Sequence, residues 1–322
     1  MKFVDLFCGG GFGARGAIRG GGKPILAVDS WKIATATYKY NFPQAKVISS
    51  NIEDINPSLL TKTVKPDILL TSPECTAHSI ARGAKIGSEK SRETAINIIT
   101  WAKALKPRWI IVENVNRMKK WNRHRELVTS LENLGYRVND LFLNSADFGT
   151  PQSRKRMFLL CDFNGTEIQN TDLIKYHKKI NNAESIIDWS NKYESTLLYT
   201  KKRAKSTIHR AERAIESLGR NIPFIIVYYG SDYAGGWQRI DTPLRTITTI
   251  DRFGLVTWKN NVAYLRMLQP SELIKAMGAG SEHKLPFGSR REKVKLCGNG
   301  VCSPVLETLF KIIKQNHEIK NK

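Results

Sequence analysis

Short apolar runs alternate with segments of helical periodicity over the first 160 residues of this 322-residue chain. The apolar runs predict buried strands at residues 3–7, 24–29, 67–70, 109–113 and 157–160. Between them, residues 32–41 and 92–105 carry apolar side chains at helical spacing, so that Ile96, Ile99 and Ala102 share one helix face. Strands that alternate with helices predict an α/β fold with a doubly wound, mostly parallel sheet covered on both faces.

The pattern changes after about residue 165, where the chain becomes polar. Residues 170–220 are rich in lysine, asparagine and serine, and residues 210–218 within them are typical of a charged helix. Regular elements are predicted again as a strand at 224–229, a helix start at 270–277 and an amphipathic helix at 305–313. This change of composition favours a second, smaller domain.

The charge of the chain is strongly unbalanced. It has 51 lysine and arginine residues against 29 aspartate and glutamate residues, a formal net charge of +22. A protein this basic is attracted to polyanions, and nucleic acid is the first candidate. The alternative is a basic protein that has no such ligand.

Cysteine usage gives no sign of disulfides or of a metal site. The five cysteines are scattered and form no CxxC pair, so neither a disulfide framework nor a zinc site is expected. Because the chain runs directly into an apolar strand, we expect no signal peptide, and no apolar run approaches the ~20 residues of a membrane span. We therefore expect a protein of the reducing cytoplasm that uses no metal and does not enter a membrane.

A glycine-rich segment at residues 9–13 follows the first predicted strand and precedes a helix. Glycines in such a turn let a ligand approach the backbone closely. Asp29 ends the next strand, where an acidic side chain accepts hydrogen bonds from ribose hydroxyls in nucleotide-binding folds. The pair predicts an adenosine-containing cofactor, with a purely structural turn as the alternative.

Reactive side chains follow the later strands. Cys75 lies just past the third strand, where a nucleophile can face the ligand crevice, and Glu113 ends the fourth strand beside it. Arg154 and Arg156 alternate at strand spacing, so both should point to one side. Taken singly, these residues also fit a buried cysteine, a surface carboxylate and a solvated basic strand.

Taken in order, these features resemble the DNA cytosine-5 methyltransferase family. The matching motifs are Asp5-Leu6-Phe7 with its glycines, Cys75, Glu113-Asn114-Val115, residues 151–156, residues 241–248 and Gly298-Asn299-Gly300-Val301. The resemblance covers residues 1–160 and about 241–313. Residues 165–225 match no motif, and it is in this region that members of the family differ because it reads the target sequence.

The resemblance implies a Rossmann-like methyltransferase domain over residues 1–160, which binds S-adenosylmethionine and releases S-adenosylhomocysteine. It implies a target-recognition domain over 161–260 and a return of the chain to the catalytic domain over 261–322. Double-stranded DNA would lie in the basic cleft between the two. We expect a monomer, and a cognate restriction endonuclease is a partner that the resemblance allows.

The resemblance also implies roles for individual residues. The cofactor would be bound by Asp5, Phe7, Gly9, Gly11, Asp29, Asn51, Ile52, Asn299 and Val301. The catalytic residues would be Cys75, Glu113, Arg154 and Arg156. Cys75 would add to carbon 6 of a flipped cytosine while Glu113 assists at N3, and Arg156 would contact the base carbonyl with Arg154 in support.

The sequence departs from the family at several positions. Glu74 precedes the nucleophile where the family has proline, and a carboxylate beside a thiol disfavours the thiolate if both face the same space. Asn51 replaces an aspartate, Trp31 is displaced by one position from the usual aromatic residue, and Gly300 replaces a serine. Residues 76–92, with their glycines and basic side chains, fit either a lid that closes on phosphates or a plain surface loop.

Two alternative functions stay open at this point. One is an RNA cytosine-5 methyltransferase, because relatives of the family modify RNA. The other is a non-catalytic DNA-binding protein on the same scaffold, for which Glu74 is the supporting feature.

Overall fold

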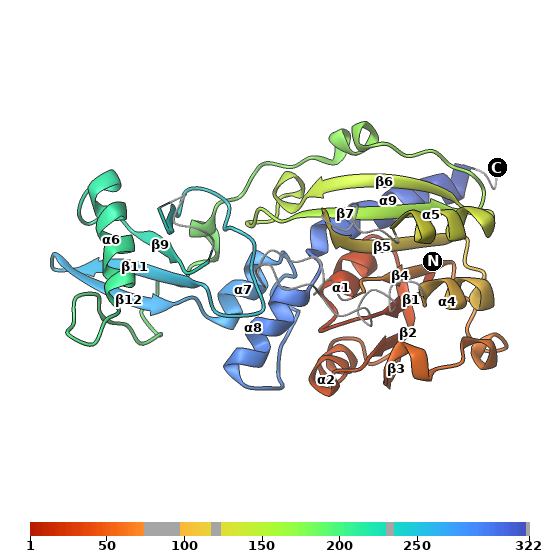
Figure 1. The fold of residues 1–322 in the computed structure, drawn as a ribbon, viewed down its shortest axis with the longest axis horizontal. Helices are drawn as coiled ribbons and strands as arrows, with labels where there is room; N and C mark the ends of the chain where they lie inside the picture. Colours follow the sequence, from red (N-terminus) through yellow and green to blue (C-terminus); the bar gives the residue numbers. More distant parts are fainter. Residues whose placement is uncertain (74–96, 117–123, 230–234, 320–322) are drawn as a thin grey trace.

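Parallel strands with apolar residues on both faces build the larger of two sheets. The computed structural model describes residues 1–73, 97–116, 124–229 and 235–319, and the larger sheet has the spatial order β3-β2-β1-β4-β5-β7-β6 (Figure 1). Its strands are β1 (Lys2–Leu6), β2 (Lys23–Asp29), β3 (Lys46–Ser49), β4 (Ile68–Thr71), β5 (Trp109–Val115), β6 (Arg137–Asn144) and β7 (Lys155–Asp162). The strands pair in parallel from β3 to β5, whereas β7 runs antiparallel to both β5 and β6.

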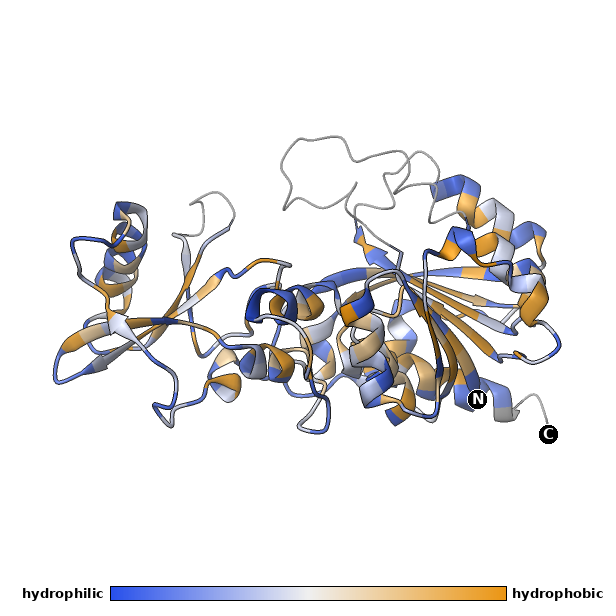
Figure 2. Cartoon of the chain, turned by 90° about the horizontal axis from the view of Figure 1, so that it is seen from below, coloured by the Kyte–Doolittle hydropathy of each residue, from blue (hydrophilic) through white to orange (hydrophobic). Residues whose placement is uncertain are grey.

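Helices cover both faces of this sheet, as the sequence pattern predicts. The helices concerned are α1 (Phe12–Arg19), α2 (Lys32–Asn41), α4 (Ile98–Leu105), α5 (His124–Asn133) and α9 (Ser303–Ile319). On one face Phe3 shares a buried cluster with Tyr38 of α2 and Phe310 of α9. On the other, Val4 shares a second cluster with Trp101 of α4. Figure 2 shows apolar residues along the strands between these helix layers, which confirms the doubly wound α/β fold.

The order of the strands places a ligand crevice at one point of the sheet. From β1 the chain moves outward through β2 and β3, then crosses back to β4 on the other side of β1. The direction of winding therefore reverses between β1 and β4, and ligands bind at the carboxyl ends of the strands at such a switch point. The predicted glycine turn follows β1, and Pro73 follows β4, so both border this crevice.

Some elements differ from the prediction. Residues 92–96, the start of the predicted helix at 92–105, lie outside the described residues, and the described helix α4 begins at Ile98. The prediction missed β3 and β6. Along β6 the buried residues Asn139, Leu141 and Leu143 alternate with exposed ones, but the sequence hides this period because the buried Asn139 is polar and the exposed Phe142 is apolar.

The smaller lobe is an antiparallel sheet in the order β10-β9-β11-β12-β8. Its strands are β8 (Thr196–Leu197), β9 (Phe224–Val227), β10 (Trp237–Arg239), β11 (Phe253–Lys259) and β12 (Val262–Met267). Helix α6 (Lys205–Leu218) covers one face, where Ala211 and Ala214 pack in a cluster with Phe224. Because β12 ends at Met267, this sheet extends past residue 260, where we expect the target-recognition domain to end.

Two helices lie between the sheets and lead the chain back to the larger lobe (Figure 1). They are α7 (Pro270–Ala276) and α8 (Arg290–Asn299), and α8 begins with a capping box formed by Ser289 and Glu292. The following helix α9 packs along α1, where Ser303 Oγ donates to the carbonyl of Phe12 at 2.7 Å. Arg290–His317 has the length and composition of a membrane span, but 78% of its most apolar window is buried inside the protein, as in a core helix.

Candidate active site

The turn after β1 has a backbone conformation that few side chains adopt. Phe7, Gly9 and Gly11 have φ angles of 57°, 51° and 83°, all in the left-handed region. A Cβ added at Gly9 would meet no described atom within 4 Å, whereas one added at Gly11 would lie 2.4 Å from the ring of Phe42. Gly9 therefore presents bare backbone to the crevice, and Gly11 is required by close packing.

Asp29 holds this turn from the end of β2. Its carboxylate accepts hydrogen bonds from the backbone nitrogens of Gly9 and Trp31, each at 2.9 Å. These bonds fix the carboxylate at the end of β2, beside the bare backbone of Gly9. Trp31 is half-buried, and the amine of Lys295 lies 4.5 Å from the centre of its ring.

Asp5 lies below the same turn, buried within β1. Burial raises the pKa of this carboxyl to about 8, and the neighbouring Asp29 carboxylate acts in the same direction, while Tyr38 lowers it. A buried acid with such a pKa is mostly protonated at neutral pH. Asp5 is thus part of the floor of the turn.

Two further predicted cofactor residues lie in the segment after β3. Asn51 is exposed, and its amide nitrogen donates to Asp54 at 2.9 Å. Ile52 is buried and packs in the same cluster as Val28 at the end of β2. The end of β3 is tied to β2 by a bond from Ser50 N to the carbonyl of Asp29 at 3.1 Å, so this segment borders the crevice next to Asp29.

The last motif of the sequence lies against the glycine turn from the C-terminal side. Asn299, the final residue of α8, is exposed, and Val301 is buried, with its Cβ 3.6 Å from the position of a Cβ on Gly13. A Cβ on Gly300 would lie 2.8 Å from the ring of Phe12. The Phe12 ring thus fills the space that a serine would need, which explains glycine at this position.

Cys75, Glu74 and residues 76–92 lie outside the described residues, so the nucleophile and the lid remain predictions. Pro73, two residues before Cys75, is described, and its carbonyl accepts a hydrogen bond from the Asn114 amide at 3.4 Å. Asn114 is buried and also accepts from the backbone nitrogen of Val115 at 2.8 Å. Asn114 therefore fixes the end of β5 to the point from which the chain leads to Cys75.

Glu113 and Arg156 form a partly enclosed ion pair at the end of β5. Arg156 Nε lies 3.2 Å from Glu113 Oε1, and the two side chains are 16% and 9% exposed. Burial raises the pKa of Glu113, whereas Arg156, Arg154 and the hydroxyl of Ser72 lower it. A carboxyl balanced in this way can hold a proton, or share one, with a ring nitrogen placed against it.

The two arginines of the motif at residues 151–156 have different partners. Arg156 pairs with Glu113, whereas Arg154 is buried and donates to the carbonyls of Ile247 and Gly298, each at 2.9 Å.

No role was predicted from the sequence for Asn114 or Gln152, although both belong to motifs that match the family. Among the described residues there is no group of three or more histidine, cysteine or acidic side chains that could hold a metal.

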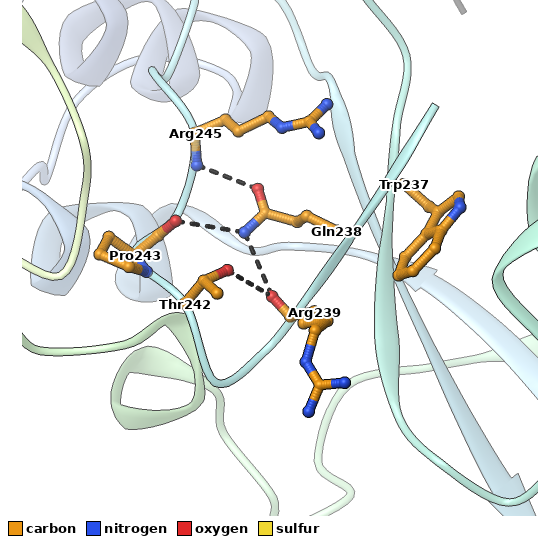
Figure 3. Close-up of a pocket in the computed structure, with 6 residues that line it drawn as sticks. All are labelled: Trp237, Gln238, Arg239, Thr242, Pro243 and Arg245. Atoms are coloured by element: carbon orange, nitrogen blue, oxygen red, sulfur yellow. Dashed lines mark hydrogen bonds between the residues drawn. The ribbon is translucent and has the colours of Figure 1, made fainter. Parts of the chain in front are cut away.

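A hollow of about 340 Å³ lies on the small lobe (Figure 3). It is lined by Trp237, Gln238, Arg239, Thr242, Pro243 and Arg245. Gln238 fixes its wall, because its amide oxygen accepts from Arg245 N at 3.0 Å. Arg239 pairs with Asp241, whereas the Arg245 guanidinium makes no hydrogen bond within the described part of the chain.

The sequence of this chain is similar to those of known methyltransferases. The family model for C-5 cytosine-specific DNA methylase matches residues 1–315. The Type II methyltransferase M.HgiDI of Herpetosiphon aurantiacus is 30% identical over 50% of this chain and 52% of its own length. M.HhaI of Haemophilus parahaemolyticus is 27% identical over 95% of this chain and 92% of its own length. The match spans about half the length of M.HgiDI and of similar relatives.

Solved structures share the fold at low sequence identity. A DNMT2 mutant of Spodoptera frugiperda is 19% identical, with a TM-score of 0.73 over 97% of this chain and 99% of that chain. A putative DNA modification methyltransferase encoded within an Escherichia coli prophage is 14% identical, with a TM-score of 0.69 over 98% of this chain and 99% of that one. Both lobes of the chain therefore belong to a known architecture.

Proposed function

Because the chain belongs to the family of C-5 cytosine-specific DNA methylases, we propose that it methylates carbon 5 of cytosine in double-stranded DNA. The observation that carries the proposal is the position of the Glu113–Arg156 pair. It lies at the carboxyl edge of the sheet from which the glycine turn and Asp29 also project. A base-contacting acid and a nucleotide-binding turn thus share one crevice.

The residues around the turn fit S-adenosylmethionine as the methyl donor. The open face of Gly9 can take a ligand against the backbone, and Asp29 can accept from the ribose hydroxyls. Asn299 and Val301 border the turn from the other side, while Phe7 belongs to the turn itself and Asn51 and Ile52 follow β3. When bound, this cofactor supplies a methyl group activated by a sulfonium.

The chemistry of the base falls to the residues of this chain. In our proposal the Cys75 thiolate adds to carbon 6 of cytosine, which breaks the ring's aromaticity and places electron density on carbon 5. Glu113 assists by holding a proton at N3, and Arg156 orients Glu113 and contacts the base carbonyl. After methylation a base removes the carbon 5 proton and the thiolate leaves, so every bond formed to Cys75 is broken again.

Base flipping and DNA binding follow from the same proposal. Carbon 6 of a stacked base is out of reach of a side chain, so the cytosine must leave the duplex to meet Cys75. The net charge of +22 supports a DNA-binding surface, and so does the Arg245 guanidinium in the small-lobe hollow, which makes no hydrogen bond to the residues that the structure describes. We further propose that the protein acts as a cytoplasmic monomer, and that it has a cognate restriction endonuclease, since M.HgiDI and M.HhaI are named Type II methyltransferases.

The test is transfer of a labelled methyl group from S-adenosylmethionine to duplex DNA and, in parallel, to RNA. We expect label in carbon 5 of DNA cytosine, and we expect Cys75→Ser to abolish it. Cys161→Ser, which changes a buried cysteine of β7, serves as the matched control and should stay active. Label in RNA alone would support the RNA alternative, and tight DNA binding without label would support the non-catalytic one.

A further inference from the structure

Two segments run side by side where the lobes meet. Residues 151–154 lead into β7 of the large sheet, and residues 244–248 lead out of the small lobe. Leu244 N donates to the carbonyl of Pro151 at 3.0 Å, and Ser153 N donates to the carbonyl of Leu244 at 2.8 Å. Thr246 Oγ1 adds a bond to the carbonyl of Ser153 at 2.9 Å. We call these two segments together with Gly298 the junction.

Gln152 fixes the junction from its centre. Its side chain is fully buried, and its amide oxygen accepts from Ile247 N at 2.9 Å. Its amide nitrogen donates to the carbonyl of Ala276, the last residue of α7, at 3.2 Å. One side chain therefore joins the segment from the small lobe to the helix that lies between the lobes.

Within the junction, Arg154 connects the segment 244–248 to Gly298, at the end of α8. Its guanidinium donates to the carbonyls of Ile247 and Gly298, and Gly298 immediately precedes the predicted cofactor residues 299–301. The contact is close, because a Cβ on Gly298 would lie 2.4 Å from the backbone of Thr248. A buried guanidinium is costly unless its donors are bonded, so both carbonyls are held where Arg154 needs them.

We propose that Arg154 is a positioning residue through which cofactor binding and DNA binding strengthen each other. This inference rests on the proposed function. A cofactor bound against residues 299–301 orders the end of α8, and Arg154 passes that order to Ile247 and to the segment that carries Arg245. Because coupling between two binding equilibria is reciprocal, DNA must raise cofactor affinity by the same factor.

The experiment measures this factor directly. The dissociation constant of a fluorescent duplex, cut from DNA that the wild type methylates, is determined with and without saturating S-adenosylhomocysteine. We expect S-adenosylhomocysteine to tighten DNA binding about tenfold in the wild type, within the usual range of coupling between sites. Arg154→Lys, which loses the two-carbonyl bridge, should bring the factor close to one.

Two further variants keep the result interpretable. Thr246→Val removes one junction hydrogen bond at a half-buried position and should lower the factor part of the way, even if Arg154→Lys folds poorly. Arg108→Lys is the matched control, because Arg108 also donates to a backbone carbonyl, that of Asn316, and precedes β5 at the opposite edge of the sheet. It should keep the wild-type factor.

The outcomes separate this inference from the proposed function. A wild type that methylates DNA but shows a factor of one overturns the inference and leaves the function standing. An unchanged factor in both Arg154→Lys and Thr246→Val overturns it too. Absence of methylation by the wild type contradicts the proposed function and this inference together.

Discussion

Arg156 Nε lies 3.2 Å from Glu113 Oε1, although the two residues belong to strands that run in opposite directions. The antiparallel register of β5 and β7 pairs Arg156 with Val115, close to the end of β5 where Glu113 lies. The arginine and burial act in opposite directions on the pKa of Glu113. The distance between the two side chains therefore affects how readily the Glu113 carboxyl takes up a proton.

Glu113→Gln keeps the size of the side chain but removes the exchangeable proton of the acid. We expect the rate of methyl transfer to fall about 10²- to 10⁴-fold, the usual contribution of a general acid. Single-turnover kinetics with labelled S-adenosylmethionine would measure it. Glu167→Gln, which changes an exposed glutamate paired with Arg137, is the control. A rate within threefold of the wild type would argue against the role of Glu113.

Arg156→Met removes a group that lowers the pKa of Glu113. The folded-state pKa of Glu113 should then rise further, because burial is no longer opposed by this cation. If the protonated carboxyl is the working form, the alkaline limb of the pH–rate profile should move to higher pH while the maximal rate falls. A profile that keeps its alkaline limb would contradict this assignment.

Asp5 should make stability depend on pH. Its pKa is 3.8 when exposed and about 8 when buried, so between these values the unfolded chain has lost the proton that the folded chain keeps. The contribution of Asp5 to the free energy of unfolding is therefore fully present below pH 3.8, and it declines as the pH rises towards 8. Asp5→Asn should gain stability relative to the wild type over this window, with an upper limit of roughly 5–6 kcal/mol.

Urea unfolding at several pH values measures this difference. Asp140→Asn, a change of an exposed aspartate in β6, is the control. A difference between Asp5→Asn and the wild type that does not vary with pH would contradict the raised pKa of Asp5.

Two glycines of α1 should respond oppositely to alanine. A Cβ on Gly16 would lie 1.9 Å from the carbonyl oxygen of Ser303, so Gly16→Ala must separate α1 from α9 and should cost about 3 kcal/mol or more. A Cβ on Gly13 would meet Val301 at an ordinary 3.6 Å, and Gly13→Ala should raise stability by about 0.5–1 kcal/mol through helix propensity. Thermal unfolding compares the two, and equal effects would contradict the close approach of α9.

Arg245 and Arg239 should differ in their contribution to DNA affinity. The Arg245 guanidinium makes no hydrogen bond to the described residues, whereas that of Arg239 is already paired with Asp241. If Arg245 contacts a phosphate, Arg245→Ala should weaken binding and reduce the slope of log K against log salt by about 0.9. Arg239→Ala is the matched change and should have the smaller effect. Fluorescence anisotropy at several salt concentrations measures both slopes.

Local pattern alone was enough for much of the fold. Apolar runs of four to six residues between helical segments predicted β1, β2, β4, β5 and β7 within a few residues, because burial on both faces requires such runs. The turn of the β11–β12 hairpin also had a local signal that was overlooked. Asn260 and Asn261 both have positive φ, at 49° and 62°, and asparagine tolerates this conformation in hairpin turns.

Some residues of the candidate site were also predictable from local sequence, whereas others were not. The order of short motifs indicated Glu113, Asp29 and the glycine turn, since their chemistry depends on residue type and on position at a strand end. The roles of Asn114 and Gln152 could not be read from the chain, because each depends on a backbone carbonyl far away in sequence. Asn114 bonds to Pro73, and Gln152 bonds to Ala276.

The sequence by itself therefore determined the class of fold, the basic character of the protein and the chemical identity of its reactive groups. Only the tertiary structure decided which arginine pairs with Glu113 and which one is buried at the junction, since Arg154 and Arg156 are equivalent by type and spacing. Only the tertiary structure shows that a Cβ at Gly300 or at Gly16 would collide with Phe12 or with Ser303. These distinctions arise from contacts between segments far apart in the chain, and no local pattern encodes the distance between them.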